Sequence, residues 1–555
     1  MSAVGCDAPR LSTHSRRDWR PVLSDEATLF LTCLWFVVAC NGPLWVAMAR
    51  AQIPIPVQSA MAVAILALHA LVLGVFVWGR ATKPALCILF VVTAIANDSM
   101  LKFGVIFDVD MARSVLLTDP DEVHEMLATL FTARLFWLGI VPAVLVLATR
   151  QQRLGLRRSL RNRALFLVAM AVLTVAALAP VSQAVFALMR SDPSLRYQIT
   201  PGNVIVSTAR ALKQDEAAPD GPRLPVASDA YRRPNTRARL PRVVVVVVGE
   251  TVRADHWGLN GYARQTTPEL AKRGDIINFA DVTACGTSTA VSLPCMFSVF
   301  GREQYDRGAI ISHESVLQVL ARLGIKVLWR DNQAGCKGAC EGIDFQTMPV
   351  QDAPGLCAEG RCLDETLLQG LAEHIKATAG DQLIVLHQLG NHGPNYFERY
   401  PAAFKRFQPT CDSTELERCS RDEIINAYDN AVLYTDSVLA RLIALLSADH
   451  RHETAVLYVS DHGESLGEYG IYLHGAPWSI APRAQLKVPM LLWLSPQTVD
   501  DLAVNHACLL ASAADPRSHD DLFHTLLGLF DVSTQAYRPD HDLLASCHNA
   551  GLASQ

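Results

Sequence analysis

Three side chains of this sequence are of the kinds that bind divalent metal ions, and each follows a predicted strand. Glu250 ends the run RVVVVVVGE, and Asp461 and His462 follow another β-branched run in YVSDHGES. Carboxylates and imidazoles are common ligands of zinc and of other borderline cations, and a tetrahedral site needs a fourth ligand. Thr289, in CGTSTAVSLPC, is the best candidate, because the apolar segment 290–300 that follows it is expected to start a helix.

The hydroxyl of Thr289 is also a candidate nucleophile. At a helix N-terminus and on a cation, a hydroxyl can lose its proton near neutral pH and attack phosphorus or carbon. Taken singly, Thr289 could be an ordinary N-cap, and His392 or His474 an ordinary loop histidine. All of these residues lie in glycine-flanked loops at strand ends, which favours a catalytic site. The sequence has no H-E-x-x-H, Walker A or Rossmann motif.

Such a site requires a sheet that brings separated strand ends together. Apolar runs rich in β-branched residues occur at 242–250, 327–330, 383–387, 455–459 and 490–494, with a helical segment at 424–446. A strand as apolar as the first must be buried on both faces, which is typical of a parallel sheet between helices. We therefore expect a doubly wound α/β domain whose ligands collect at the carboxyl ends of its strands.

The first part of the chain has a different character. The 555-residue sequence is 50% hydrophobic and 19% charged. Five apolar stretches, at 27–49, 57–78, 84–107, 127–149 and 164–189, are long enough to cross a bilayer. Asn97, Asp98 and Lys102 interrupt the third, which is expected to break early or to lead into a polar cavity. We expect a membrane domain of five transmembrane helices at 1–190, a linker along the membrane surface at 191–241 and an α/β catalytic domain at 242–555.

Charge patterning predicts the orientation of the chain in the membrane. Basic segments precede the first span, separate the second from the third and precede the fifth, so these segments are expected to be cytoplasmic. An odd number of spans then places the catalytic domain outside the cytoplasm. The alternative that 27–49 is a cleaved signal peptide is disfavoured, because its loss would put the basic loop at 150–163 on the wrong side. The net charge of −5 gives no basic footprint for nucleic acid.

The linker carries a second basic feature. Arg232, Arg233, Arg237 and Arg239 lie close together in it. They could contact lipid phosphates, although a solvated linker is the commoner explanation.

Cysteine spacing gives independent support for an oxidising compartment. Of the 14 cysteines, eight form close couples: Cys285 and Cys295, Cys336 and Cys340, Cys357 and Cys362, and Cys411 and Cys419. Short loops of this kind favour disulfides over a zinc cluster, since the spacing is not C-x-x-C and no tetrad forms. Whether Cys508 and Cys547 form a fifth bridge is left open by the sequence.

Six motifs in order resemble those of one family. They are VVVGETVRADHWGLNGY, ACGTSTAVSLPCMFS, LWRDNQAGCKG, LGNHGPNYF, VSDHGESLGEYG and YLHGAP. The sequence resembles the lipid A phosphoethanolamine transferases of Gram-negative bacteria, the group that includes the mobile colistin-resistance enzymes. The resemblance spans nearly the whole chain. It implies five transmembrane helices in the inner membrane before an alkaline-phosphatase-like catalytic domain in the periplasm, and the cysteine couples match the family's bridges.

The resemblance also implies a mechanism. Glu250, Thr289, Asp461 and His462 would bind a catalytic zinc ion, and Thr289 would take phosphoethanolamine from phosphatidylethanolamine. A phosphate of lipid A would then attack the phosphothreonine, which lowers the negative surface charge and polymyxin binding. His392, His474 and Lys337 would hold the phosphoethanolamine group or a second zinc ion.

The sequence departs from the family in one segment, and it leaves the acceptor and the type of reaction open to alternatives. Where the family usually has an amide and a carboxylate thought to face the lipid headgroup, the segment DMARSVLLTD has Ser114 and Leu117. Donor or acceptor recognition is therefore expected to differ. A core sugar of lipopolysaccharide is a rival acceptor. A sulfatase-like or phosphodiesterase-like hydrolase is less favoured because the C-x-P-x-R motif is missing, and a catalytically dead scaffold is disfavoured because the ligand residues are intact.

Overall fold

The computed structural model describes residues 20–118, 132–152, 154–216, 221–233, 239–348, 355–358 and 361–548. The chain divides into two compact units. The first comprises Met1–Ile95 and Thr132–Pro193, and the second comprises Ala96–Phe131 and Ser194–Gln555. This division differs from the expected boundary at residue 190, because residues 96–118 group with the unit that contains the sheet.

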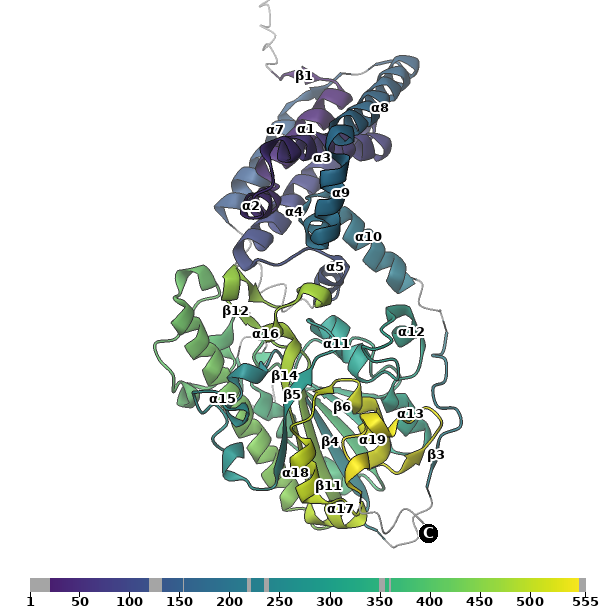
Figure 1. Ribbon diagram of the computed structural model, residues 1–555, viewed down its shortest axis with the longest axis vertical. Coiled ribbons are helices and arrows are strands. Elements are labelled where there is room, and N and C mark those ends of the chain that lie inside the picture. Colours follow the sequence, from purple (N-terminus) through teal and green to yellow (C-terminus); the bar gives the residue numbers. More distant parts are fainter. Residues whose placement is uncertain are drawn as a thin grey trace, which may run out of the picture. The chain divides into compact units, whose positions relative to one another are not determined.

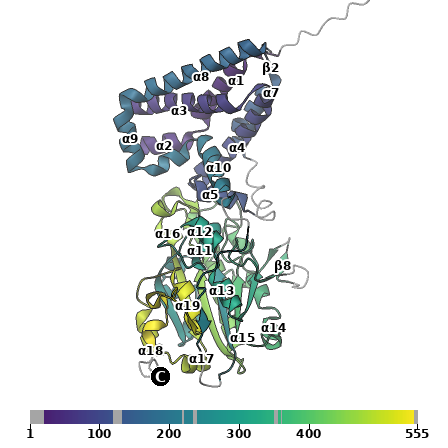
Figure 2. The same ribbon diagram turned by 90° about the vertical axis from the view of Figure 1, so that its right-hand side faces the viewer.

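The first unit is helical. Its helices are α1 (Asp25–Ala39), α2 (Gly42–Arg50), α3 (Ile55–Phe76), the first part of α4 (Thr82–Phe103), a π-helical turn (Leu135–Ile140), α7 (Val141–Ala148), α8 (Leu156–Leu178) and α9 (Ser182–Ser191). Helix α3 lies beside both α1 and α8 (Figures 1 and 2). Ser24 caps α1 by accepting a hydrogen bond from the Ala27 amide at 3.1 Å.

Among the described residues, length and hydropathy identify four helices that could cross a membrane, or five if a bent pair counts as one span. The bent pair is α1 with α2, at 45°, and the four helices are Ile55–Phe76, Gly79–Phe103, Leu156–Ser191 and Arg421–Ser447. The bent pair and the first three helices correspond to the first, second, third and fifth predicted spans. In the fourth predicted span the described chain has the shorter apolar helix Leu135–Ala148, and residues 127–131 lie outside the described residues.

The expected break in the third span is absent from the described chain. Helix α4 continues through Asn97 and Asp98 to Phe103, and both polar side chains are buried. Burial against protein keeps these groups away from an apolar surface, so the helix can continue past them.

The second unit contains an eight-stranded sheet in the order β15-β5-β14-β11-β4-β10-β6-β7. The strands are β4 (Arg242–Gly249), β5 (Ile276–Thr283), β6 (Lys326–Asp331), β7 (Asp344–Thr347), β10 (Gln382–His387), β11 (Glu453–Ser460), β14 (Lys487–Leu494) and β15 (Arg517–Ser518). The five strands from β11 to β7 are mutually parallel. The expectation of a fully parallel sheet is wrong at β14, which runs antiparallel to both β11 and β5. The connection from β11 to β14, residues 461–486, contains short strands and the four-residue α16 (Arg483–Leu486) but no long helix of the kind that usually forms a parallel crossover.

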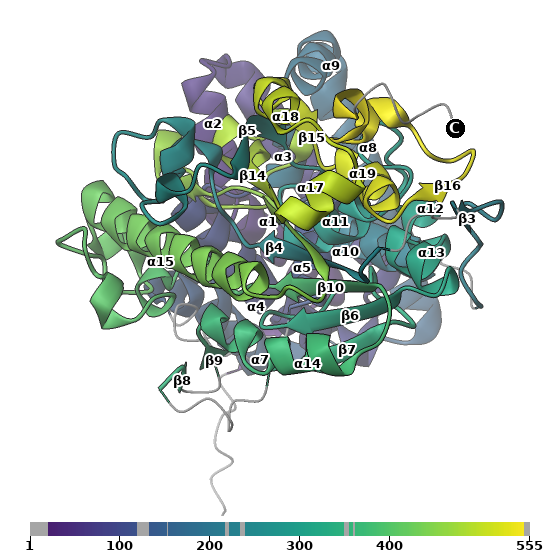
Figure 3. The same ribbon diagram turned by 90° about the horizontal axis from the view of Figure 1, so that it is seen from below.

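Helices cover both faces of this sheet, which explains the uninterrupted valine run of β4. Val244, Val246 and Val248 pack with α11 (Thr289–Met296), α13 (Val316–Arg322) and α19 (Asp521–Leu529). Val243, Val245 and Val247 pack with α14 (Leu371–Ala377) and α15 (Arg421–Ser447) on the other face (Figure 3). Helix α15 passes the length and hydropathy test for a span, but its apolar side chains lie in the core under the sheet.

The remaining elements of the second unit are short. They are α5 (Val109–Leu116), α10 (Gly202–Glu216), α12 (Arg307–Ser312), α17 (Pro496–Asp501), α18 (His506–Ser512), and the paired strands β3 (Tyr231–Arg232) with β16 (Val532–Ser533), β8 (Cys357–Ala358) with β9 (Arg361–Cys362), and β12 (Ser465–Leu466) with β13 (Tyr472–Leu473). In the first unit β1 (Val22–Leu23) pairs with β2 (Arg150–Gln151).

The expected linker at 191–241 is partly structured. It contains α10, and residues 217–220 and 234–238 lie outside the described chain, which leaves Arg237 undescribed. Arg232 and Arg239 form ion pairs with Asp381. These two arginines therefore fasten the chain ahead of β4 to the sheet domain.

Disulfides join Cys285 to Cys295, Cys336 to Cys340, Cys357 to Cys362, Cys411 to Cys419 and Cys508 to Cys547. Each lies in the second unit. The last of them is the pair that the sequence left open.

Arg242, at the start of β4, is fully buried among carboxylates. Its guanidinium donates to Glu453 at 2.9 and 3.0 Å and also pairs with Asp501 and with Asp531. Removing one partner of a buried ion pair leaves the other charged and desolvated, which costs about 3–5 kcal/mol.

We predict that Arg242→Met lowers the free energy of unfolding by about 3–5 kcal/mol in chemical denaturation of the full chain in detergent. Arg242→Met combined with Glu453→Gln recovers part of this loss. The exposed pair between Arg538 and Glu303 provides the control, since Arg538→Met is expected to cost about 1 kcal/mol or less. Equal effects of the two single changes would contradict this role of Arg242.

Candidate active site

Glu250 and Asp461 lie close together because they follow neighbouring parallel strands. Strands β4 and β11 pair in register, with Gly249 opposite Ser460, so the next residues emerge at the same edge of the sheet. The amides of Thr251 and His462 donate to Asp461 Oδ1 at 3.2 and 2.7 Å, which fixes the orientation of this carboxylate.

Thr289 is brought to the same edge by α11. Ser288 has an extended backbone and precedes the helix, so Thr289 is its first residue. Ser292 Oγ donates to the Asp461 carbonyl at 2.6 Å and accepts from the Gly286 amide at 2.9 Å, which ties the first turn of α11 to the loop after β11. The helix ends at Met296, earlier than the expected stretch to residue 300.

The four side chains converge within hydrogen-bonding distance. The Thr289 hydroxyl donates to Glu250 Oε1 and Oε2 at 3.3 and 3.1 Å and lies 3.4 Å from His462 Nε2. His462 Nε2 lies 3.4 Å from Glu250 Oε1 and 3.3 Å from Asp461 Oδ2. One ligand atom each from Glu250, Asp461 and His462 lie within 4.8 Å of one another, and all three side chains are buried.

The donor set fits a divalent cation. Asp461 Oδ2 is buried and has no hydrogen-bond partner in the described part of the chain. The Gly463 carbonyl lies 3.0 Å from His462 Nδ1, which assigns the proton to Nδ1 and leaves the lone pair of Nε2 facing the carboxylates. Burial lowers the pKa of His462 to about 4, so the imidazole is neutral at physiological pH. The neutral imidazole adds no positive charge to the two buried carboxylates, and a cation bound among them would balance their charge.

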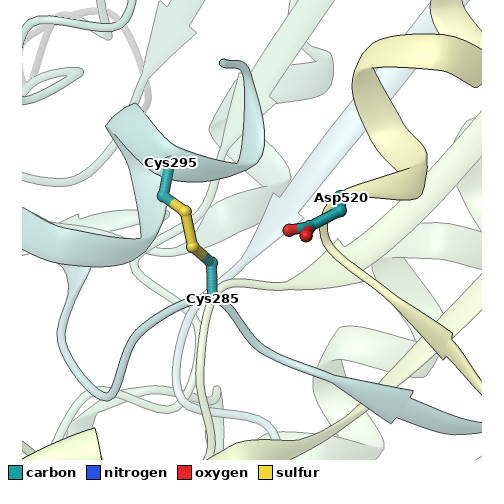
Figure 4. A group of neighbouring side chains, drawn as sticks. All are labelled: Cys285, Cys295 and Asp520. Atoms are coloured by element: carbon teal, nitrogen blue, oxygen red, sulfur yellow. A yellow bond between two sulfur atoms is a disulfide. The ribbon is translucent and has the colours of Figure 1, made fainter. Parts of the chain in front are cut away.

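A second group of metal-binding residue types does not form such a site. Cys285, Cys295 and Asp520 lie together, but the two sulfur atoms are joined in a disulfide and offer no thiolate (Figure 4). The Asp520 carboxylate accepts hydrogen bonds from the amides of Arg302 and Glu303 at 2.6 and 3.0 Å. This group therefore holds the loop beyond α11 in place.

Two further histidines extend the site from His462. The rings of His462 and His474 lie 4.4 Å apart between centroids, and those of His474 and His392 lie 5.5 Å apart. Burial, with the neighbouring His474 as the next cause, holds the pKa of His392 well below its usual value. His474 Nδ1 lies 3.4 Å from Oε1 of the buried Glu464. The N–H groups of imidazoles can donate to a phosphate oxygen, and a carboxylate can accept from an ammonium group.

Lys337 contacts the residue that caps the end of α5. Its ammonium donates to the Leu117 carbonyl at 3.1 Å, and no contact with the Glu250, Asp461 and His462 group is recorded for the described residues. Leu117 caps α5, where Ser114 Oγ donates to the Asp110 carbonyl at 3.0 Å. A Cβ added at Gly475 would lie 2.8 Å from Met111 Cε, so α5 packs against the loop that carries His474.

Two residues at the site were missed by sequence reasoning. Gln333 Nε2 donates to Glu250 Oε2 at 3.2 Å, and its turn is held by Asp331, which accepts from the Gly335 amide at 2.9 Å and pairs with His387 at 2.7 Å. Glu464 is the other. Gln333 lies in the motif LWRDNQAGCKG, two residues after the end of β6. Glu464 lies in the motif VSDHGESLGEYG, two residues after His462.

Comparisons with known proteins agree on one family. A family model described as phosphoethanolamine transferase EptA/EptB matches residues 65–215, and a sulfatase model matches residues 242–532. The phosphoethanolamine transferase EptA of Salmonella typhimurium is 39% identical over 487 residues, which are 86% of this chain and 87% of that protein. The phosphatidylethanolamine transferase Mcr-1 of Escherichia coli is 37% identical over 462 residues, which are 81% of this chain and 84% of that protein.

A solved structure is similar over almost the whole chain. It is the integral membrane lipooligosaccharide phosphoethanolamine transferase A of Neisseria meningitidis, with a TM-score of 0.90 and 33% identity. The match covers 95% of this chain and all of that one. The helical region and the sulfatase-like sheet domain therefore have the arrangement of elements found in that protein.

We predict that a divalent cation stabilises the metal-depleted protein through this site. A ligand present at a hundred times its Kd adds about 2.7 kcal/mol to the free energy of unfolding. The increase in Tm on adding zinc is therefore expected in the wild type and lost in Asp461→Asn. Asp520→Asn, in the group that contains the disulfide, is expected to keep it. If Asp461→Asn responds to the cation like the wild type, the assigned site is wrong.

Proposed function

Because this chain belongs to the lipid A phosphoethanolamine transferases, we propose that it moves phosphoethanolamine from phosphatidylethanolamine to a phosphate of lipid A. The transfer runs through a phosphothreonine intermediate on Thr289. One observation carries the proposal: the Thr289 hydroxyl is at the first residue of α11 and within 3.1–3.4 Å of Glu250 and His462.

Glu250, Thr289, Asp461 and His462 would hold one zinc ion. Nitrogen and oxygen ligands in this number are typical of zinc. When bound, the cation would lower the pKa of the hydroxyl and offset the charge that develops on the transferred group. Support for a cation comes from the buried Asp461 Oδ2, which has no hydrogen-bond partner in the described chain. His392 and His474 would hold the phosphoethanolamine group or a second zinc ion.

The chain's own groups account for the first transfer. Thr289 Oγ1 attacks the phosphorus of the donor, a bond forms between them, and the bond from phosphorus to the oxygen of diacylglycerol breaks. The proton that leaves Oγ1 passes to Glu250, the acceptor of its hydrogen bond, and from there to the departing oxygen of diacylglycerol, so the step is balanced. Thr289 is the first residue of α11, and the N-terminus of a helix favours negative charge.

The second transfer reverses the roles. A phosphate oxygen of lipid A attacks the phosphorus, the bond from phosphorus to Thr289 Oγ1 breaks, and the proton that the attacking phosphate loses passes by way of Glu250 to Oγ1. A covalent intermediate lets one site serve two bulky lipids in turn. This order explains how a single buried hydroxyl can connect two substrates that do not need to bind together.

His392, His474 and Lys337 are proposed to hold the phosphoethanolamine group. The two histidines adjoin His462 through ring contacts, which places them beside the reaction centre. Lys337 donates to the carbonyl of Leu117, so α5 lies next to the lysine. Ser114 and Leu117 offer no charged side chain there, so the recognition of the donor headgroup in this chain would rest on the two histidines, on Lys337 and on backbone carbonyls.

The protein has several apolar helices of membrane-spanning length and a separate catalytic domain. We propose that it lies in the inner membrane with the catalytic domain in the periplasm. Two features support this orientation. The basic segments before the first, third and fifth predicted spans favour the cytoplasmic side, and the disulfides of the second unit favour an oxidising compartment. Adding phosphoethanolamine to lipid A converts an anionic phosphate into a zwitterionic group, which would weaken the attraction of cationic polymyxins.

We predict that incubation with phosphatidylethanolamine adds one phosphoethanolamine to Thr289, detected by mass spectrometry of the intact protein and its peptides. Thr289→Ala is expected to lose the adduct and to reduce transfer to lipid A at least about a thousandfold. Thr289→Ser keeps a hydroxyl and is expected to retain both.

Mass spectrometry of the lipid product separates the rival acceptors. Phosphoethanolamine on a core sugar with lipid A unchanged would show that the acceptor is wrong, and ethanolamine phosphate released to water would indicate a hydrolase. An adduct that persists in Thr289→Ala would exclude Thr289 as the nucleophile.

A further inference from the structure

Arg302 carries a charge that no carboxylate neutralises within ion-pair distance in the described part of the chain. Its side chain makes one hydrogen bond there, from a terminal nitrogen to the Cys285 carbonyl at 3.3 Å. The guanidinium lies 4.2 Å from the ring centroid of Trp478 and 4.8 Å from that of Tyr305. A stacked guanidinium keeps its N–H groups directed outward in its own plane, where they can bind an oxyanion bidentately.

Tyr305 places a second donor at the same location. Its hydroxyl oxygen is buried and has no hydrogen-bond partner in the described chain. A buried hydroxyl without a partner is uncommon and costs free energy. Burial, followed by the charge of Asp110, raises the pKa of Tyr305, so the hydroxyl keeps its proton and remains a donor.

The two residues lie beside the element that carries the nucleophile. Arg302 donates a hydrogen bond to the carbonyl of Cys285, which is linked by a disulfide to Cys295 of α11. Trp478 Nε1 donates to the Ala284 carbonyl at 3.2 Å, and Trp478 follows His474 by four residues. Arg307, the first residue of α12, donates to the carbonyl of Ala290, the neighbour of Thr289, at 3.0 Å. The segment from Arg302 to Arg307 therefore borders the start of α11.

We propose that Arg302 and the Tyr305 hydroxyl form a subsite for an anionic phosphate group of a substrate, and specifically for that of the acceptor lipid. This inference rests on the proposed function and adds a residue-level basis for acceptor binding. The acceptor phosphate is an anion that must approach a negatively charged phosphodiester on Thr289. The repulsion between them favours a cation on the acceptor side. Asp110 and Asp520 attract the charge of Arg302, but neither is within ion-pair distance of it in the described chain, so its N–H groups can still bind an anion. The donor carries phosphate too, so the two sources must be separated by experiment.

The two half-reactions, measured separately with the full-length protein in detergent, distinguish these sources. Formation of the Thr289 adduct from phosphatidylethanolamine reports the donor step. Transfer from the isolated adduct to purified lipid A in mixed micelles reports the acceptor step. For Arg302→Gln we expect adduct formation within about twofold of wild type and the second-order rate constant for lipid A lowered about tenfold or more. Arg302→Lys keeps the charge and is expected to recover part of the loss.

Tyr305→Phe removes only the hydroxyl and keeps the ring contact with Arg302. We expect it to lower the acceptor step several-fold and to leave the donor step unchanged. Arg273→Gln is the matched control, because Arg273 also lies over an aromatic ring, that of Trp493 at 5.8 Å, but pairs with Asp275. It is expected to leave both steps unchanged.

The outcomes are distinct. A wild type that forms no adduct would reject the proposed function itself. A wild type that forms the adduct and transfers it, with Arg302→Gln equal to it in both steps, would reject the subsite. Loss of the donor step alone or of both steps equally would assign Arg302 to the donor or to folding, and would also overturn the proposal. A rise in Tm for Tyr305→Phe with unchanged transfer would show that the hydroxyl is only an unsatisfied buried group.

Discussion

The structure depends on the convergence of two buried carboxylates and a neutral imidazole on one hydroxyl. Glu250 and Asp461 would repel each other at this separation in a medium of low dielectric constant, and a cation among them removes that cost. The sheet fixes this arrangement, since β4 and β11 are neighbours in register and are packed on both faces. The hydroxyl comes from a third element, α11, which is held by the Cys285–Cys295 disulfide and by the hydrogen bond from Ser292 to the Asp461 carbonyl. The disulfide and this hydrogen bond involve other residues than Thr289, and they limit the motion of the helix that carries its hydroxyl.

Two sets of side chains adjoin this centre. His474 and His392 continue from His462 as neighbouring imidazoles, and Arg302 contacts Cys285 and also Trp478, which follows His474 by four residues. In the proposed mechanism one reacting oxygen serves two lipids in turn, with the histidines binding the headgroup and with Arg302 and Tyr305 binding the incoming anion. The disulfides stabilise the loops that carry these groups without occupying the site.

Much of this site could be predicted from sequence because parallel strands bring their carboxyl ends together. The runs of β-branched residues predicted β4, β6, β10 and β11, and the polar residues that follow these strands lie at one edge of the sheet. The direction of β14 could not be predicted, since an apolar run has the same pattern in either direction. Strand β5 was missed because its segment, IINFADVT, is only partly buried and contains polar residues. Helix α15 is long and apolar enough to cross a membrane, and only its packing against the sheet shows that it is a core helix of the second unit. The contact of Lys337 with Leu117 joins positions 220 residues apart, which no local pattern encodes.

The central claim is that a cation is held by Glu250, Thr289, Asp461 and His462. Anomalous diffraction from crystals of the zinc-loaded protein, recorded on both sides of the zinc absorption edge, tests it directly. The account predicts one strong peak about 2 Å from oxygen or nitrogen atoms of these four side chains. A difference map without a peak there, or with its strongest peak at a place that excludes Thr289, would contradict it.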